Sequence, residues 1–137
     1  MRFSMSSEIC SGIMGIGIDL VSLMRFERCV QRWGERFFHR IFTEQELSLC
    51  SKKSMPHQSL AVRFAAKEAI MKALGTGWSQ GIKWKDISIE EQEYGKPYVA
   101  ISSSAWYLKG KKIHISLTHT DENAMAFVII ECRENKT

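Results

Sequence analysis

Residues 63–77 read RFAAKEAIMKALGTG, and this stretch decides the fold because it contains the strongest helix signal in the chain. Apolar side chains recur there at helical spacing, which predicts a helix that begins near Ser59 and buries one stripe. Gly75 suits the left-handed cap at the end of a helix, so Gly75-Thr76-Gly77 is expected to form a flexible loop. The stripe consists of Leu60, Phe64, Met71 and Leu74.

Glu68 interrupts this apolar stripe, since it lies four residues after Phe64 and three before Met71. A buried carboxylate without a partner is costly, so Glu68 is expected to be neutralised, paired or bound to a metal ion. One partner is Lys72, through an i,i+4 salt bridge worth about 0.3 to 0.5 kcal/mol. Three cations on or beside this helix could contact phosphate groups or form an ordinary solvated face: Arg63, Lys67 and Lys72.

Residues 13–21 alternate between large apolar side chains and mostly small or acidic ones, which predicts a strand. Asp19 shares one face of this strand with Gly15 and Gly17, and the glycines leave room for a ligand to approach the backbone. Alternatively, Asp19 is the N-cap of the helix that follows. If Asp19 and Glu68 converge, they suit Mg²⁺, which takes one or two protein carboxylates together with waters and substrate phosphates.

The remaining elements follow from local patterns. Apolar residues between Leu23 and Ile41 at helical spacing predict an amphipathic helix bent at Gly34. Thr43 and Glu46 form a capping box for a short helix, which the stretch around Pro56 is expected to break. Further strands are predicted at residues 86–91, 97–101, 113–118 and 122–131, with a helical turn within 102–108.

The two C-terminal strands differ in the character of their faces. In residues 113–120 (IHISLTHT), isoleucine and leucine point inward and polar side chains point to the opposite face, with His119 at the strand's end. Such a position suits contacts to phosphate or ribose, although a plain polar surface is an equal alternative. Residues 124–130 are apolar on both faces, so we expect this strand to be covered by a helix and by another layer or another subunit.

The composition fits one compact domain, with 45% of the 137 residues hydrophobic and 25% charged. No apolar run approaches the roughly 20 residues of a membrane-spanning helix, and the N-terminus lacks the features of a secretory signal, so a cytoplasmic location without membrane contact is expected. The four cysteines have no CxxC spacing and are interpreted as free thiols. Residues 13–133 are expected to form the domain, with 1–12 a dispensable extension and 134–137 a tail.

The net charge of +4 is modest, so the positions of the arginines matter more than their number. Among them lie only Glu27 and Glu35, fewer acids than a solvated face usually has, which favours an acidic partner. The alternative is a small non-catalytic module that binds nucleic acid through the same stripe. Four arginines step by three and four residues along the first predicted helix: Arg25, Arg28, Arg32 and Arg36.

Four blocks of this sequence together resemble the holo-acyl-carrier-protein synthase family of phosphopantetheinyl transferases. They have the order and spacing of that family over roughly residues 13–133: GIGIDLVSLMRFE (15–27), RFAAKEAIMKALGTG (63–77), YGKPYV (94–99) and ISLTHT (115–120). The resemblance implies a single α+β domain in which an antiparallel sheet packs against a long helix, assembled as trimers with each active site between two subunits. It also implies transfer of the 4'-phosphopantetheine arm of coenzyme A to a serine of an apo acyl carrier protein, giving 3',5'-ADP, in fatty acid biosynthesis.

The resemblance also assigns roles to residues. Asp19 and Glu68 match the family's ligands for Mg²⁺, for which Mn²⁺ is a possible substitute, and with Lys72 they form the catalytic set. Glu68 would draw the proton from the carrier serine, directly or through a water, and Lys72 would steady the departing 3',5'-ADP. The basic helix would dock the acidic carrier through Arg25, Arg28 and Arg32. Coenzyme A would contact Arg63, Lys67, Lys72, Gly75, Gly77, Pro97, His119 and Thr120.

Ser22 departs from the family pattern, because this position is commonly acidic there. The departure leaves open how the outer shell of the metal site is completed. A closer alternative within the family is a member that has lost activity, or one that modifies the carrier domain of a polyketide or peptide synthase.

Overall fold

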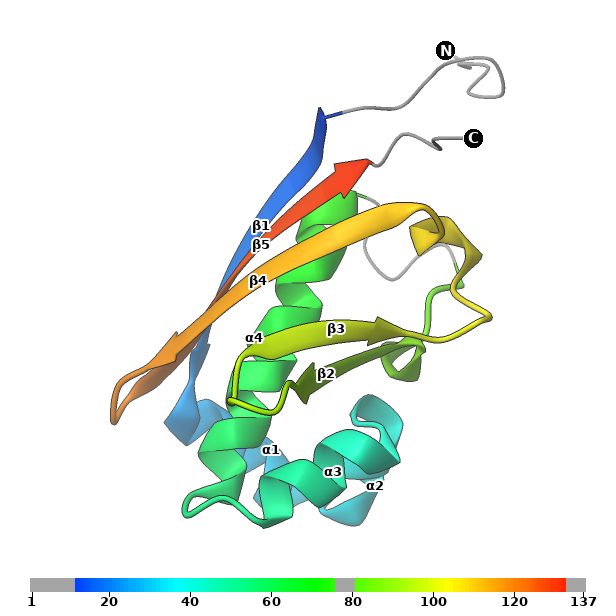
Figure 1. Ribbon diagram of the computed structural model, residues 1–137. Coiled ribbons are helices and arrows are strands. Elements are labelled where there is room, and N and C mark those ends of the chain that lie inside the picture. Colours follow the sequence, from blue (N-terminus) through cyan, green and yellow to red (C-terminus); the bar gives the residue numbers. More distant parts are fainter. Residues whose placement is uncertain (1–11, 76–80, 133–137) are drawn as a thin grey trace.

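The computed structural model describes residues 12–75 and 81–132. Its main sheet is antiparallel, with strand order β1-β5-β4. The central strand β5 (Asn123–Cys132) lies between β1 (Gly12–Ser22) and β4 (Lys111–His119). The long helix α4 (Pro56–Leu74) packs along one face of this sheet, as Figure 1 shows. The predicted α+β fold, with an antiparallel sheet against a long helix, is confirmed.

The glycines of β1 lie directly against the backbone of α4. A Cβ on Gly15 would stand 1.9 Å from the carbonyl oxygen of Ala73, and one on Gly17 would stand 1.8 Å from that of Ala69. Real Cβ atoms essentially never come so close, so only glycine permits this approach. The prediction that the glycine face makes room for a ligand is therefore wrong, because the helix occupies that space.

Helix α4 begins and ends at residues with clear capping properties. Pro56 is its first residue, which suits proline because the missing N–H has no partner at that position. The helix thus starts three residues before the predicted Ser59, at the residue that was expected to act as a breaker. Gly75 caps its C-terminus with φ of 78° and donates its N–H to the carbonyl oxygens of Met71 and Lys72, as predicted.

Three shorter helices gather around the N-terminal end of α4 (Figure 1). The predicted bend at Gly34 is a complete break, with φ of 59°, between α1 (Leu23–Trp33) and α2 (Glu35–Ile41). Ser22 caps α1 by accepting from the Arg25 N–H, so the cap is Ser22 and the alternative cap role of Asp19 is excluded. The predicted capping box of Thr43 and Glu46 starts α3 (Glu44–Ser51).

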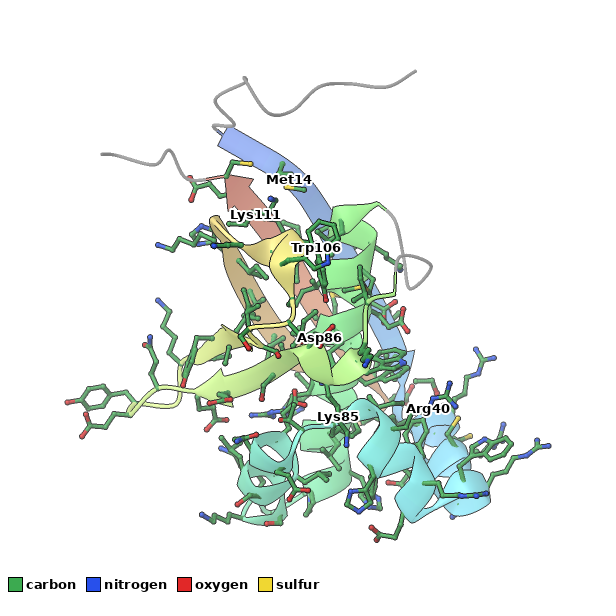
Figure 2. All side chains as sticks on the ribbon, turned by 90° about the vertical axis from the view of Figure 1, so that its right-hand side faces the viewer. Met14, Arg40, Lys85, Asp86, Trp106 and Lys111 are labelled. Carbon is green, nitrogen blue, oxygen red and sulfur yellow. The ribbon has the colours of Figure 1, made fainter. Side chains whose placement is uncertain are left out.

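A hairpin of β2 (Ile87–Glu91) and β3 (Pro97–Ile101) forms a second, two-stranded sheet that crosses α4 in Figure 1. Short 3-10 helices flank it, η2 (Trp84–Asp86) and η3 (Trp106–Leu108). Asp86 joins the two, because its carboxylate accepts from the hydroxyls of Ser104 and Tyr107. Figure 2 shows Trp106 and Lys111 with Met14 at the far end of the sheet from Arg40.

The face of the sheet that turns away from α4 stays open and apolar within one chain. Ile16, Ile18 and Leu20 of β1 are each more than half exposed, and Phe127 of β5 is 39% exposed. Register places Phe127 opposite Ile18. The sequence predicts that both faces of β5 are covered. Helix α4 covers one face, and residues 12–75 and 81–132 leave the other face open.

Two further predictions concern the cysteines and membranes. Cys29 and Cys50 are free thiols as predicted, whereas Cys132 is disulfide-bonded, contrary to the interpretation of all four cysteines as free. Within the described ranges, no helix has the length and apolar character required to cross a bilayer.

Candidate active site

Asp19 and Glu68 line the same pocket, which has a volume of about 290 Å³. Asp19 comes from β1, near the end that leads into α1, and Glu68 comes from α4 on the side of α1 and α2. Phe64 of α4 and Arg25 of α1 also line the pocket. Asp19 and Glu68 therefore do converge, which the sequence predicts only conditionally. Arg25, the first arginine of the basic stripe, lines the same pocket.

Lys72 is held against the same carboxylate. Its Nζ lies 3.0 Å from Oδ1 of Asp19 and 3.0 Å from the carbonyl oxygen of Ile18. The Lys72 side chain is 56% exposed, while that of Asp19 is only 16% exposed. Lys72 therefore forms a charged pair with Asp19 and keeps a surface open to an incoming anion.

The donor set of this pocket fits Mg²⁺. This ion accepts oxygen ligands and commonly takes only one or two protein carboxylates, with waters and substrate phosphates completing six-fold coordination. Asp19 and Glu68 supply two carboxylates on the wall of one pocket. Across residues 12–75 and 81–132, no cluster of three or more His, Cys, Asp or Glu side chains could hold a metal. An ion at Asp19 and Glu68 would thus depend on substrate oxygens.

A second pocket, of about 430 Å³, collects predicted coenzyme A contacts. Arg63 from α4, Pro97 from β3 and His119 from the end of β4 all line it. Arg63 is buried to 4% exposure and is fixed by donating Nε to the carbonyl oxygen of Ile89 at 3.0 Å. A cation, a strand-end histidine and the proline that begins β3 thus meet in one place, a combination suited to a phosphate and its ribose.

Glu91 and Lys53 belong to this second pocket, although the sequence reading did not single them out. Glu91 accepts from Lys53 Nζ at 2.9 Å and from Arg63 Nη2 at 3.2 Å. Partial burial acts to raise the pKa of Glu91, but the two cations outweigh it and hold this pKa below its ordinary value. The run Lys52-Lys53 before Pro56 is a sequence signal that could have pointed to Lys53.

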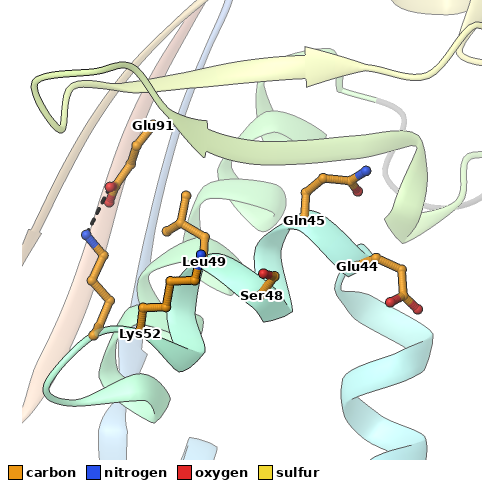
Figure 3. Close-up of a pocket in the computed structure, with 7 residues that line it drawn as sticks. Glu44, Gln45, Ser48, Leu49, Lys52 and Glu91 are labelled. Atoms are coloured by element: carbon orange, nitrogen blue, oxygen red, sulfur yellow. Dashed lines mark hydrogen bonds and ion pairs between the residues drawn. The ribbon is translucent and has the colours of Figure 1, made fainter.

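A larger and more open pocket, of about 630 Å³, adjoins the second pocket by sharing Lys53 and Glu91 with it. Figure 3 shows that α3 supplies most of its wall, with Glu44, Gln45 and Ser48 along the helix. Glu91 of the hairpin lies toward the other end of the pocket, where it pairs with Lys53. Acidic and basic groups are mixed here, so this pocket has no clear preference for an anion.

Lys67 does not reach a phosphate site, and the prediction that it contacts coenzyme A is wrong. Its side chain is fully buried, and Nζ lies 2.7 Å from Oε1 of Glu46. Burial lowers the pKa of Lys67, opposed by the adjacent Glu46. The helix α4 is buried almost all round at this level, so a lysine here needs an internal partner.

Three more residues are predicted to contact coenzyme A: Thr120, Gly75 and Gly77. The Thr120 hydroxyl accepts from the backbone N–H groups of Glu122 and Asn123, which shapes the turn between β4 and β5. Gly75 forms the cap of α4 close to the sheet. Gly77 lies outside the described residues.

The predicted carrier-binding arginines Arg25, Arg28 and Arg32 are exposed on α1, whose buried face is anchored by Phe26. Arg32 also lies over the exposed ring of Trp33 at 5.2 Å. Because Arg25 lines the pocket of Asp19 and Glu68, the basic surface continues directly into that pocket.

Within one chain the structure does not bring the two groups of predicted residues together. Asp19 and Glu68 line one pocket, whereas Arg63 and His119 line another that shares no lining residue with it. Arg63 and Phe64 are neighbours on α4 but line different pockets, so the helix itself separates them. We call these two pockets, that of Asp19 and that of Arg63, the two half-sites.

Comparisons with known proteins identify the family to which this chain belongs. The model of the 4'-phosphopantetheinyl transferase superfamily matches residues 15–129. A holo-[acyl-carrier-protein] synthase of Protochlamydia amoebophila is 44% identical over 117 residues, which cover 85% of this chain and 96% of that protein.

Two solved structures of similar proteins extend the agreement to the fold. The crystal structure of holo-[acyl-carrier-protein] synthase from Neisseria meningitidis has a TM-score of 0.82 at 35% identity, covering 88% of this chain and 99% of that chain. The synthase from Bacillus anthracis in complex with CoA (3',5'-ADP) has a TM-score of 0.75 at 36% identity, covering 88% and 98%. This chain therefore belongs to the 4'-phosphopantetheinyl transferase superfamily, as the four sequence blocks predict.

Proposed function

We propose that this protein transfers the 4'-phosphopantetheine arm of coenzyme A to a serine of an apo acyl carrier protein, giving the holo carrier and 3',5'-ADP. The observation that supports this most is the convergence of Asp19, Glu68 and Lys72 beside the basic face of α1. Similarity to holo-[acyl-carrier-protein] synthases supports the same reaction. The proposed setting is fatty acid biosynthesis in the cytoplasm.

The chemistry requires a serine oxygen to bond to the phosphorus next to the pantetheine arm while the bond from that phosphorus to 3',5'-ADP breaks. Glu68 accepts the serine proton, directly or through a water, as the new bond forms. Lys72 lies beside Asp19 and stabilises the negative charge that develops on the departing 3',5'-ADP. Mg²⁺ held by Asp19 and Glu68, or Mn²⁺ in its place, would supply further charge neutralisation at the phosphates.

The second pocket provides the remaining coenzyme A contacts in this proposal. Arg63, Lys53 and His119 offer cationic and hydrogen-bonding groups for the nucleotide end. Since α4 separates this pocket from Asp19 and Glu68, one coenzyme A would bridge the half-sites of two neighbouring subunits. A homotrimer formed through the open face of the sheet, with Ile18 and Phe127 near its centre, would bring such half-sites together.

The exposed arginines of α1 are the proposed docking surface for the carrier, whose partner face would be acidic. Arg25 borders the pocket and would contact the carrier near its serine, with Arg28 and Arg32 further along the helix. Docking through such charges is sensitive to salt. A nucleic-acid module would use the arginines but would leave the Asp19–Lys72 pair and the adjacent Glu68 without a role.

The decisive experiment is to incubate the purified protein with coenzyme A, Mg²⁺ and an apo acyl carrier protein and to weigh the carrier by intact mass spectrometry. A gain of about 340 Da, the formula mass of one phosphopantetheine arm, that disappears with a chelator would establish the reaction and its metal dependence. No gain with several carriers would refute the proposal.

A further inference from the structure

Lys67 and Glu46 form a buried ion pair that plays no part in the proposed chemistry. Their Nζ and Oε1 atoms lie 2.7 Å apart, and both side chains are fully buried. The same ammonium donates to the carbonyl oxygen of Ile41 at 2.8 Å and to that of Trp84 at 3.1 Å. All three N–H bonds of Lys67 thus have acceptors, which come from α3, α2 and η2.

Both carboxylate oxygens of Glu46 also accept hydrogen bonds from backbone N–H groups. Its Oε1 accepts the Thr43 N–H at 2.9 Å, and its Oε2 accepts the Ile89 N–H of β2 at 2.8 Å. The pair therefore connects α2, α3, η2 and β2 to one turn of α4. Apolar side chains of similar size generally stabilise a core as well as a buried ion pair does, so stability alone is a weak reason for this arrangement.

The turn of α4 that contains Lys67 also shapes the candidate active site. Successive residues of a helix point about 100° apart, so Lys67 faces α2, α3 and η2 while Glu68 lines the pocket that it shares with Asp19. The next residue, Ala69, has its carbonyl oxygen against Gly17, two residues before Asp19. The rotation and height of this one turn therefore set the position of Glu68 relative to Asp19.

We propose that the Glu46–Lys67 pair is a positioning device, which fixes this turn of α4 so that Glu68 meets Asp19 across the pocket. Both are positioning residues, because their polar atoms face inward to the partners given above. The proposal rests on the proposed function to the extent that Asp19 and Glu68 are taken as the catalytic and metal-binding carboxylates.

Two variants separate positioning from stability, because they change the two in opposite directions. Glu46→Gln keeps an acceptor for Lys67 but leaves the ammonium without a counter-charge, so Tm should fall by at least about 5 °C while kcat stays within about threefold. Glu46→Gln with Lys67→Met removes both charges and the tether, so Tm should recover part of this loss, because an unpaired buried charge costs more than the loss of a donor to the carbonyl oxygens of Ile41 and Trp84. Its kcat should fall at least about tenfold, because a small misplacement of a catalytic group is costly, with KM for coenzyme A within about twofold.

Leu108→Ala in η3 is the matched control, since Leu108 is buried to 1% exposure and lies outside the elements that the Glu46–Lys67 pair connects. It should lower Tm and leave kcat unchanged at temperatures where the protein is folded. If kcat instead follows Tm across Glu46→Gln and the double variant, the pair is only structural and the proposal is overturned.

A second readout does not depend on turnover. The affinity for Mn²⁺ in the presence of coenzyme A, measured by isothermal titration calorimetry, should fall about tenfold in the double variant and stay within about twofold in Glu46→Gln. Equal affinities in the two variants and the wild type would also overturn positioning. If the two variants show these different Mn²⁺ affinities but the wild type transfers no phosphopantetheine, the proposed function is refuted and the positioning role is supported.

Discussion

The carbonyl oxygen of Ala69 in α4 lies 1.8 Å from the point that a Cβ on Gly17 of β1 would occupy. Strand and helix are thus in direct backbone contact at this position. β1 cannot move outward without losing its ladder to β5, in which Gly17 lies opposite Val128. Because Asp19 follows Gly17 on the same face of β1 and Glu68 precedes Ala69, this contact sets the spacing between the two carboxylates.

Gly17→Ala should therefore be strongly destabilising. The added methyl meets backbone, which cannot turn aside as a side chain could, so we expect a loss of about 3 kcal/mol or more in the free energy of unfolding. Urea denaturation measures it. Gly110→Ala is a graded control, since Gly110 has φ of 76° but open space around it, and should cost about 1 kcal/mol. Equal costs for both variants would argue against the close contact.

Asp19→Asn and Glu68→Gln should each lower kcat by about 10² to 10³ while Tm changes little. Each change keeps the size of the side chain but removes the charge that the proposed metal ion and proton transfer require. Carrier modification by intact mass spectrometry gives the rate, and circular dichroism gives Tm. Glu35→Gln is the control, because Glu35 is 84% exposed and pairs with His39 on its own helix. Normal turnover in either site variant would refute the assignment.

Most elements of the fold could be predicted because their signals are local. The Thr43–Glu46 capping box, the Gly75 cap and the alternation of β1 each depend on residues a few positions apart, and each is present. The residues themselves predict the convergence of Asp19 and Glu68 only conditionally, since nothing local relates residues 19 and 68, and the resemblance of the four sequence blocks supplies the rest of the prediction.

Two of the errors concern residues whose partners are distant in sequence. Gly15 and Gly17 were read as ligand space because their neighbours on α4, Ala69 and Ala73, lie more than fifty positions away. Lys67 was read as a surface cation because its partner is on α3. The alanines around Lys67, all buried, were a usable signal that this helix is enclosed on most sides.

Arg28→Glu should weaken carrier recognition more than coenzyme A binding. Arg28 is exposed on α1 next to the pocket-lining Arg25, and a reversed charge repels an acidic partner. We expect KM for the carrier to rise about tenfold with KM for coenzyme A nearly unchanged, and the wild-type KM for the carrier to rise with salt. Lys111→Ala is the control, because Figure 2 shows Lys111 far from the α2 end marked by Arg40. An equal effect of both changes would contradict a specific docking surface.

Glu91 makes stability depend on pH in one direction. Its pKa is held below the ordinary 4.5 in the folded state, chiefly by Lys53 and Arg63 acting against partial burial. The stabilisation is therefore complete above pH 4.5 and is lost as pH falls through the lower folded-state pKa. Wild type should have a higher Tm than Glu91→Gln at pH 7, and the difference should shrink below about pH 4. A difference that is constant from pH 7 to pH 3 would exclude a role of the Glu91 charge.

The separation of the two half-sites by α4 leads to a test of subunit sharing. Glu68→Gln disables the pocket of Asp19, and His119→Ala disables the pocket of Arg63, so each homo-oligomer should be nearly inactive. If each site joins the halves of two neighbouring chains, mixed oligomers contain some sites with two intact halves. Co-expression should then recover about a quarter of wild-type activity, because each half is intact with a probability of one half when the chains mix at random.

Ile18→Lys on the open sheet face should abolish the recovery by preventing assembly, which light scattering would show as a monomer. Activity that stays at the level of the single variants, in oligomers shown to be mixed, would mean that one chain holds the whole site.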